Sequence, residues 1–418
     1  MFENQEKIDR VLLIGVHRGS QNPLEDSTAD SMRELSELAE TAGAEVLGEI
    51  VQNRDTVDRA TYLGEGKLVE VQEAANALSA NLLVVDDELT GSQLRNIENA
   101  TGLNVIDRSA LILDIFAGRA LSGEGKLQVE LAQLKYQLPR LAGGYSSLSR
   151  LGGGIGTRGP GETKLESDRR HIRSRISALE REIETLRRHR ALIRDRREKN
   201  EVPTAALVGY TNSGKSTLLN TLTGADALAK DMLFATLDPT ARALRLADGR
   251  EALLVDTVGF IRKLPHHLIE AFRSTLEEAT NADVLVHVID AACPETENQI
   301  AVVEKLLSQL GCDGKPKITV YNKCDLLEDK PVPPYTSNTV CISAKNNTGT
   351  DALLELLDLH LPGRRRKMHL LIPYANGNVL NMIRTSGDMI SEEYTPEGIL
   401  VECMADAALY AACMQFQK

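Results

Sequence analysis

Short apolar runs alternate with amphipathic stretches over the first 120 residues of the chain. The runs at 11–16, 45–51 and 82–85 are typical of buried strands, and apolar positions at helical spacing recur within 30–42, 67–80 and 92–100. Strands that alternate with helices predict a parallel sheet with helical crossovers. We therefore predict an N-terminal α/β domain over residues 1–120. The segment Tyr62-Leu-Gly-Glu-Gly-Lys67 holds only a fragment of a phosphate-binding motif, so we interpret it as a loop that enters a helix.

Two helices that pair along one seam are predicted over residues 121–200. In the first, leucines at 127, 131, 134 and 138 recur at steps of three and four residues, which is the period of an amphipathic helix. In the second, apolar residues at 165, 172, 176, 179, 183 and 186 repeat with the spacing of a helix-pairing seam. A single connection joins the two helices, so we expect an antiparallel hairpin.

The connection of this hairpin, residues 143–161, is rich in glycine and contains Pro160. Its composition alone favours a flexible linker. A connection of this length at the end of a hairpin is uncommon unless it is functional, and this one carries Tyr145, Arg150 and Arg158. Arginine neutralises phosphate and tyrosine stacks on bases, so we also predict a contact with RNA here.

A phosphate-binding loop is predicted near residue 210. The strand-like residues 205–208 run into Gly209-Tyr-Thr-Asn-Ser-Gly-Lys-Ser216, and the helix-like residues 217–222 follow. This arrangement places a Gly-x-x-x-x-Gly-Lys-Ser motif between a strand and a helix, where backbone N–H groups and the helix N-terminus bind phosphates. We expect Lys215 to reach the β- and γ-phosphates and Ser216 to bind Mg²⁺.

The residues that follow favour a GTPase over other enzymes with this loop. Strand-like residues 241–247 and 251–256 flank Asp248-Gly249, a dipeptide typical of a tight hairpin turn, and small GTPase domains have such a hairpin after their first helix. The second strand ends in Asp256-Thr-Val-Gly259. There the carboxylate can hold Mg²⁺ through water, and the glycine N–H can contact the γ-phosphate.

Two further strand ends select guanine. Residues 317–321 lead into Asn322-Lys-Cys-Asp325, and residues 339–342 lead into Ser343-Ala-Lys345. The carboxylate of Asp325 can accept hydrogen bonds from the ring N–H and the exocyclic amine of guanine, whereas adenine would leave it unpaired, a difference worth about 10⁴ in discrimination. The stem of Lys323 can cover the base, and the backbone around Ala344 can bond the guanine oxygen. We assign residues 201–363 to a GTPase domain.

The charge of the chain is distributed unevenly. The formal net charge is −12, but residues 164–200 hold 13 Lys and Arg against 7 Asp and Glu, which leaves +6 there and −18 elsewhere. Charged residues on a paired helix usually form its solvated face. The excess of arginine over lysine favours phosphate recognition, because guanidinium groups match phosphate oxygens bidentately.

Composition sets further bounds on the class of protein. With 42% hydrophobic and 26% charged residues, it is typical of a soluble globular chain. The six cysteines lack the spacing of zinc ligands, which favours reduced thiols and leaves a zinc site as the weaker alternative. No apolar run approaches the ~20 residues of a bilayer-spanning helix, and the N-terminus lacks the pattern of a signal peptide. We expect a cytoplasmic protein.

Five longer segments are similar to the HflX family of ribosome-associated GTPases, which belong with the translation-factor-related and Obg-like GTPases. They are residues 107–116 (DRSALILDIF), 123–133 (GEGKLQVELAQ), 153–163 (GGIGTRGPGET), 234–240 (FATLDPT) and 256–262 (DTVGFIR). The resemblance covers nearly the whole chain. It implies an α/β protein with an N-terminal α/β domain, a long antiparallel helical hairpin, a P-loop GTPase domain and a small C-terminal α/β domain at 364–418.

The resemblance also implies a function. It implies a monomer that hydrolyses GTP, binds the large ribosomal subunit with the hairpin tip near the peptidyl-transferase region, and splits or recycles stalled or idle ribosomes. The alternatives are an ATP-dependent RNA-remodelling enzyme, a GTPase of ribosome assembly, and an RNA-binding module whose nucleotide is only structural. A metabolic kinase would share the phosphate-binding loop, but the guanine motif disfavours it.

Three residues bear on the mechanism of hydrolysis. Mg²⁺ needs a further ligand from a segment that orders with the triphosphate, and of Thr236 and Thr240 we choose Thr236, because its spacing resembles that of the Mg²⁺-binding threonine of the Obg-like GTPases. Phe260 follows Gly259, where many GTPases have a glutamine that orients water, so we expect slow turnover that ribosomes accelerate. Asn212 resembles the asparagine of potassium-activated GTPases, so K⁺ is an expected cofactor beside Mg²⁺.

These interpretations give defined sets of site residues. Catalytic roles are predicted for Lys215, Thr236 and Gly259, and Mg²⁺ ligation for Ser216, Thr236 and, through water, Asp256. The predicted nucleotide-binding set comprises Gly209, Tyr210, Thr211, Asn212, Ser213, Gly214, Lys215, Ser216, Thr217, Phe234, Ala235, Thr236, Leu237, Asp238, Asp256, Thr257, Val258, Gly259, Asn322, Lys323, Asp325, Ser343, Ala344 and Lys345. The predicted RNA contacts are Arg150, Arg158, Arg169, Arg170 and Arg173.

Overall fold

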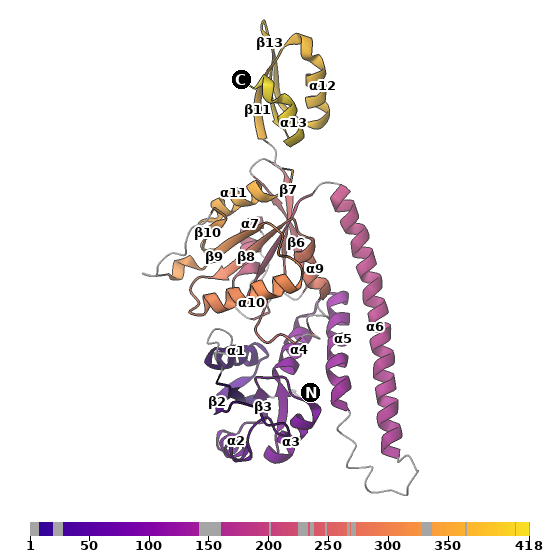
Figure 1. Ribbon diagram of the computed structural model, residues 1–418, viewed down its shortest axis with the longest axis vertical. Helices are drawn as coiled ribbons and strands as arrows, with labels where there is room; N and C mark the ends of the chain where they lie inside the picture. The colour runs from indigo at the N-terminus through magenta and orange to yellow at the C-terminus, as the bar shows by residue number, and fades with distance from the viewer. Residues whose placement is uncertain are drawn as a thin grey trace, which may run out of the picture.

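The computed structural model describes most of the chain. The described residues are 8–19, 28–141, 160–199, 202–224, 233–234, 238–246, 249–265, 268, 273–327, 337–363, 366–405 and 407–417. Their elements form an α/β protein with three separate sheets and one helical hairpin (Figure 1). The predicted α/β class is therefore confirmed. The division at 120/121, 200/201 and 363/364 stays a prediction.

A four-stranded parallel sheet forms the N-terminal region. Its strands β1 (Arg10–His17), β2 (Glu45–Asn53), β3 (Leu82–Val85) and β4 (Asn104–Asp107) lie in the order β2-β1-β3-β4. Helices α1 (Thr28–Thr41), α2 (Glu65–Leu78), α3 (Gly91–Thr101) and α4 (Arg108–Arg119) follow these strands in turn. The predicted three strands and three helices are present, with β4 and α4 in addition.

Alternate residues of β1 enter two different apolar layers. Leu12 and Ile14 pack in the layer of α2 and α3, whereas Val11 and Leu13 pack with α1 and α4. This alternation follows from the period of two in a strand. The second layer continues without a break into the GTPase region, where it includes Phe234.

The predicted hairpin is present as α5 (Gly123–Arg140) and α6 (Pro160–Lys199), which lie side by side (Figure 1). Leu131, Ile176, Leu179 and Ile183 form the buried centre of the seam between them. Because proline is favoured at the first position of a helix, α6 begins at Pro160, one residue before the predicted end of the tip. Residues 142–159, which hold the rest of the predicted tip, lie outside the described residues.

A six-stranded sheet with the order β10-β9-β8-β5-β7-β6 forms the GTPase region. Its strands are β5 (Thr204–Gly209), β6 (Thr240–Arg245), β7 (Glu251–Asp256), β8 (Val284–Asp290), β9 (Lys317–Asn322) and β10 (Thr339–Cys341). Only the pair β6 and β7 is antiparallel among these, and Gly249 closes its turn with φ 84°. The helices are α7 (Lys215–Thr223), α9 (Arg273–Asn281), α10 (Thr296–Gln309) and α11 (Thr350–His360). The carboxyl ends of β5, β7 and β9 bring the predicted nucleotide motifs to one edge of this sheet.

The small C-terminal region is a third sheet with its own core. Strands β11 (Arg366–Ile372), β12 (Asp388–Thr395) and β13 (Gly398–Ala405) form an antiparallel sheet in the order β11-β13-β12. Helices α12 (Gly377–Ser386) and α13 (Ala407–Cys413) pack on it around Leu370, Ile383 and Val401. Figure 1 shows this unit at the opposite end of the molecule from the N-terminal sheet.

Candidate nucleotide site

The predicted phosphate-binding loop connects β5 to α7. Gly214 precedes the helix with φ 91°, and a Cβ atom there would lie 2.2 Å from Nδ2 of Asn322. Only glycine fits this conformation and this close approach. The hydroxyl oxygens of Thr211 and Ser213 are buried and have no hydrogen-bond partner among the described residues. Buried polar groups are normally paired, so these two hydroxyls fit a loop that receives phosphate oxygens.

Lys215 lies at the start of α7 with its side chain buried. Its Nζ donates to the carbonyl oxygens of Gly209 at 3.1 Å and Tyr210 at 2.7 Å. Burial lowers the pKa of this ammonium group to about 8, although the carboxylate of Asp256 acts in the opposite direction. A phosphate in the loop would therefore meet an ammonium group that lacks a direct carboxylate partner within the described part of the chain.

The oxygen atoms predicted to serve Mg²⁺ converge beside this lysine. The hydroxyl of Ser216 donates to Oδ2 of Asp256 at 2.6 Å, and Asp256 is buried at the end of β7. A hydroxyl and a carboxylate are the hard oxygen ligands that Mg²⁺ prefers. Gly259 comes close to the same place, because a Cβ atom there would lie 2.8 Å from Cα of Thr211 and 3.1 Å from Nζ of Lys215. These residues thus fit a magnesium-bound triphosphate.

The two guanine motifs meet at Asn322. Its Nδ2 donates to the carbonyl of Ser213 at 2.9 Å, and its Oδ1 accepts from the backbone N–H of Ala344 at 2.9 Å. Asn322 therefore braces the phosphate-binding loop against the second guanine loop. Lys323 has φ 62° and pairs with Asp290 at 2.8 Å, and Asp325 is exposed in the short 3-10 helix Cys324–Leu326.

The segment predicted to reach Mg²⁺ is anchored on both sides outside the GTPase sheet. Ala235, Thr236 and Leu237 lie outside the described residues. Phe234 is buried and meets Phe116 of α4 edge to face, with ring centroids 4.7 Å apart. The carboxylate of Asp238 accepts hydrogen bonds from the backbone of Leu121 and Ser122. The nucleotide contact predicted for Asp238 stays a prediction, since this carboxylate already binds the N-terminus of α5.

A buried ionic cluster that the sequence analysis missed joins the N-terminal sheet to the phosphate-binding loop. Arg108 is 1% exposed and pairs with Glu34 at 2.6 Å and with Asp86 at 2.8 Å. Glu34 also accepts a hydrogen bond from the hydroxyl of Tyr210, in the loop itself. Burial raises the pKa of Glu34, while Arg108 and Tyr210 act in the opposite direction. An arginine between Asp107 and an apolar run was a signal available in the sequence, because arginine is rarely buried unless it is paired.

Residues that follow the Asp256–Gly259 motif also lie at the interface between the N-terminal sheet region and the GTPase region. Arg262 pairs with Glu295 at 2.6 Å, and Lys263 lies 2.5 Å from Asp86 and 3.1 Å from Asp87. The N-terminal sheet region therefore contacts both the phosphate-binding loop and the segment after the γ-phosphate motif.

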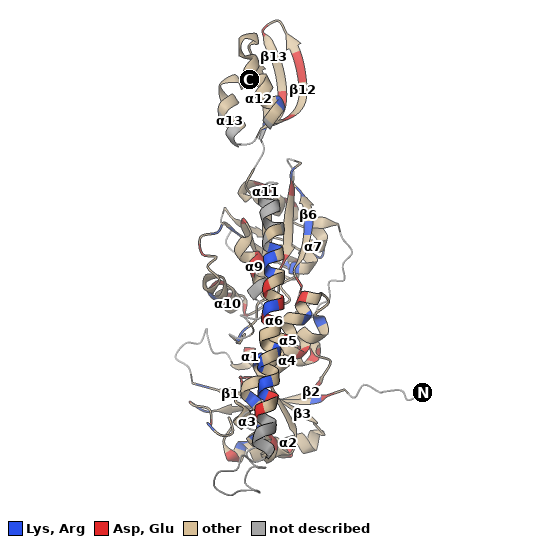
Figure 2. Ribbon diagram, turned by 90° about the vertical axis from the view of Figure 1, so that its right-hand side faces the viewer, with Lys and Arg blue, Asp and Glu red and all other residues tan. Residues whose placement is uncertain are grey.

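The predicted RNA contacts divide between described and undescribed residues. Arg170 and Arg173 are exposed near the first turns of α6, and Arg169 is partly buried. Arg150 and Arg158 lie outside the described residues. Figure 2 shows Lys and Arg positions recurring along α6, with some Asp and Glu positions between them. Farther along the hairpin, Arg175 and Arg190 pair with Glu130 and Glu124 of α5, so part of the charge serves the hairpin itself.

Comparison with known proteins decides the family. Models of the families described as GTP-binding GTPase N-terminal, GTP-binding GTPase Middle Region and 50S ribosome-binding GTPase match residues 29–117, 119–197 and 204–323. The GTPase HflX of Caldanaerobacter subterraneus subsp. tengcongensis is 56% identical over 373 residues, which cover 89% of this chain and 87% of that protein. This chain belongs to the HflX family. The HflX GTPases of Lacrimispora saccharolytica and Escherichia coli K12 are 49% and 42% identical, over 99% and 91% of this chain and 97% and 89% of their own lengths.

Membership in the HflX family confirms the expected activity class. The chain is a GTP-hydrolysing, ribosome-associated protein. A GTP-binding protein from Sulfolobus solfataricus, solved with GDP, is 27% identical with a TM-score of 0.44 and covers 84% of this chain and 97% of its own. Within the described residues, no helix is both long and apolar enough to cross a membrane.

Proposed function

We propose that this HflX protein couples GTP hydrolysis to binding of the large ribosomal subunit and splits or recycles stalled or idle ribosomes. The observation that carries the proposal is a complete set of nucleotide motifs at the end of a long basic hairpin. In this proposal Lys215 contacts the β- and γ-phosphates, Ser216 and Thr236 bind Mg²⁺, and Asp256 holds it through water. Asp325 and the backbone around Ala344 select guanine. The protein acts as a cytoplasmic monomer.

The side chain of Phe260 supports a dependence on the ribosome. It is 1% exposed and packs in the apolar layer between the N-terminal sheet and the GTPase region. Its backbone is also fixed, because its N–H donates to the carbonyl of Gly209 and its carbonyl accepts from Thr211. An apolar side chain in this position cannot orient a water molecule. We therefore propose slow hydrolysis by the isolated protein, with the missing group supplied by the ribosome.

The arginines near the start of α6 support an RNA partner. In the proposal, Arg170 and Arg173, together with Arg150, Arg158 and Arg169, contact ribosomal RNA near the peptidyl-transferase region. Contacts of this kind add affinity through counterion release, so each phosphate contact increases the salt dependence of binding.

The first test is GTP turnover by the purified protein, alone and with each ribosomal subunit, with ATP as the control nucleotide. Strong acceleration by the large subunit and selectivity for GTP are expected. Arg170→Ala/Arg173→Ala should weaken binding to the large subunit and lower the salt slope by about one to two. The matched control is Arg188→Ala, an exposed arginine farther along the same helix. If turnover is GTP-selective but indifferent to both subunits, the ribosomal part of the proposal is wrong.

Potassium is a second proposed cofactor, because Asn212 of the phosphate-binding loop resembles the asparagine of potassium-activated GTPases. Replacing K⁺ by Na⁺ at constant ionic strength should lower the rate of hydrolysis. An equal rate in both salts would remove potassium from the mechanism.

A further inference from the structure

The connection between α4 and α5 holds the carboxylate of Asp238. The backbone N–H groups of Leu121 and Ser122 donate to Oδ2 of Asp238 at 3.1 Å and 2.8 Å. The hydroxyl of Ser122 donates to Oδ1 of the same carboxylate. This hydroxyl oxygen also accepts from the backbone N–H of Gly125 at 2.8 Å, which caps α5. One serine therefore caps the hairpin helix and binds the segment that follows Thr236.

Gly125 makes room for this contact. A Cβ atom at residue 125 would lie 2.4 Å from Oδ1 of Asp238 and 3.1 Å from Oγ of Ser122. Gly123, two residues earlier in the same helix, has no atom within 4 Å of its hypothetical Cβ. A Cβ at residue 125 would therefore displace the carboxylate of Asp238, whereas a Cβ at residue 123 would not.

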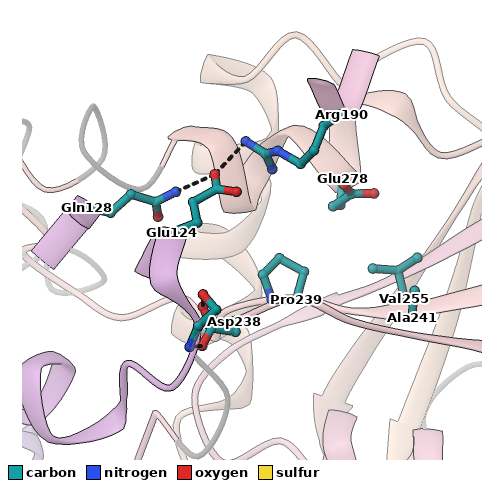
Figure 3. Close-up of a pocket in the computed structure, with 9 residues that line it drawn as sticks. Glu124, Gln128, Arg190, Asp238, Pro239, Ala241, Val255 and Glu278 are labelled. Atoms are coloured by element: carbon teal, nitrogen blue, oxygen red, sulfur yellow. Dashed lines mark hydrogen bonds and ion pairs between the residues drawn. The ribbon is translucent and has the colours of Figure 1, made fainter. Parts of the chain in front are cut away.

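A cavity of about 270 Å³ lies beside the contact. Figure 3 shows Asp238 and Pro239 at its edge, with Glu124 and Arg190 of the hairpin and Glu278 of α9 around it. Glu124 pairs with Arg190 at 2.7 Å and accepts a hydrogen bond from Gln128. The cavity gives the side chain of Asp238 space to move away from Ser122 without disturbing the Glu124–Arg190 ion pair that joins the two hairpin helices.

We propose that Ser122, Gly125 and Phe116 are positioning residues for GTP hydrolysis. They lie outside the GTPase domain and fix the two sides of the segment that holds Thr236: Phe116 packs on Phe234, and Ser122 binds Asp238. The inference rests on the proposed role of Thr236 as an Mg²⁺ ligand. The contact with Ser122 fixes Asp238, two residues after the threonine that the proposal assigns to the metal. The phosphate-binding loop and the guanine motifs, which bind the nucleotide, do not depend on the contact between Ser122 and Asp238.

The decisive variant is Gly125→Ala, with Gly123→Ala as its matched control. Alanine at 125 keeps the backbone N–H that Ser122 caps and favours the helix, but its Cβ displaces Asp238. Single-turnover hydrolysis by the full-length Gly125→Ala protein should be slower by about tenfold, with GTP affinity within about twofold of the parent. The melting temperature should not fall. Gly123→Ala should leave all three quantities unchanged.

Two further variants separate positioning from other roles. Asp238→Ala should match Gly125→Ala, and the double variant should show no additional loss, because both remove one contact. If Gly125→Ala hydrolyses GTP as fast as Gly123→Ala, or faster, the inference is overturned. If Thr236→Ala keeps the parental rate, the proposed Mg²⁺ ligand is wrong and the inference falls with it. An inactive Thr236→Ala protein beside a fully active Gly125→Ala protein overturns the inference alone.

Discussion

The hydroxyl of Tyr210 donates a 2.7 Å hydrogen bond to Glu34, which lies 176 positions earlier in the chain. Tyr210 belongs to the phosphate-binding loop, and Glu34 belongs to the first helix of the N-terminal sheet region. The same hydroxyl accepts a 2.9 Å hydrogen bond from the backbone N–H of Arg262. One side chain therefore joins the loop that binds phosphates, the segment after Gly259 and a domain that has no nucleotide motif.

Removing this hydroxyl should measurably destabilise the protein. Tyr210→Phe keeps the ring but leaves the Glu34 carboxylate and the Arg262 N–H each without one buried partner, at a cost of about 1–3 kcal/mol. Urea denaturation measures the difference. The matched control is Tyr374→Phe, whose exposed hydroxyl bonds the carbonyl of Thr395 at 2.6 Å, and we expect a loss below about 0.5 kcal/mol there. Equal effects of the two substitutions would contradict the buried role of Tyr210.

Arg108 should contribute far more than an ordinary ion pair. Replacing it by methionine leaves the buried carboxylates of Glu34 and Asp86 without their main counter-charge, which costs about 3–5 kcal/mol. The control is Arg10→Met, because the exposed Arg10–Glu45 pair at 3.3 Å should contribute at most about 1 kcal/mol. The free energies of unfolding of the two variants, each compared with that of the parent protein, measure this difference. If Arg108→Met/Glu34→Gln/Asp86→Asn is no more stable than Arg108→Met alone, uncompensated charge is not the cause.

The parts of the site that could be predicted from the sequence are those in which one strand end carries one motif. Gly209–Ser216 and Asp256–Gly259 each lie beside a strand whose apolar run is visible in the sequence, so their meeting at one sheet edge follows from the fold class. The contact of Tyr210 with Glu34 and that of Ser122 with Asp238 could not be predicted. Both contacts depend on how separate domains pack. Their partners lie 176 and 116 positions apart in the chain, and no local pattern of residues predicts which distant surfaces meet.

Asp325 should decide the base that the protein accepts. Its carboxylate accepts two hydrogen bonds from guanine in our proposal, and Asp325→Asn replaces one acceptor by a donor. Affinity for GTP should fall by at least about 100-fold, while xanthosine triphosphate, which has a carbonyl in place of the exocyclic amine, should gain affinity. Competition binding with the two nucleotides measures the change. A variant that binds both nucleotides as the parent does would show that another residue selects the base.

The ammonium group of Lys215 should make nucleotide binding depend on pH. Burial lowers its pKa to about 8, and a bound phosphate would raise that pKa because the charged form gains negative neighbours. Binding then takes up a proton, so affinity is complete below pH 8 and falls as the pH rises through 8. Between pH 7 and 8.5, below the range in which the guanine ring itself ionises, the dissociation constant for GTP should rise about fourfold.

Fluorescence titration gives this profile, and calorimetry in two buffers with different heats of ionisation counts the proton. Lys215→Arg is the control, because arginine keeps its charge across this range and should bind GTP with a flat profile, whether or not its affinity is lower. Release of a proton by the parent protein, or a pH dependence shared by the arginine variant, would place the titrating group elsewhere.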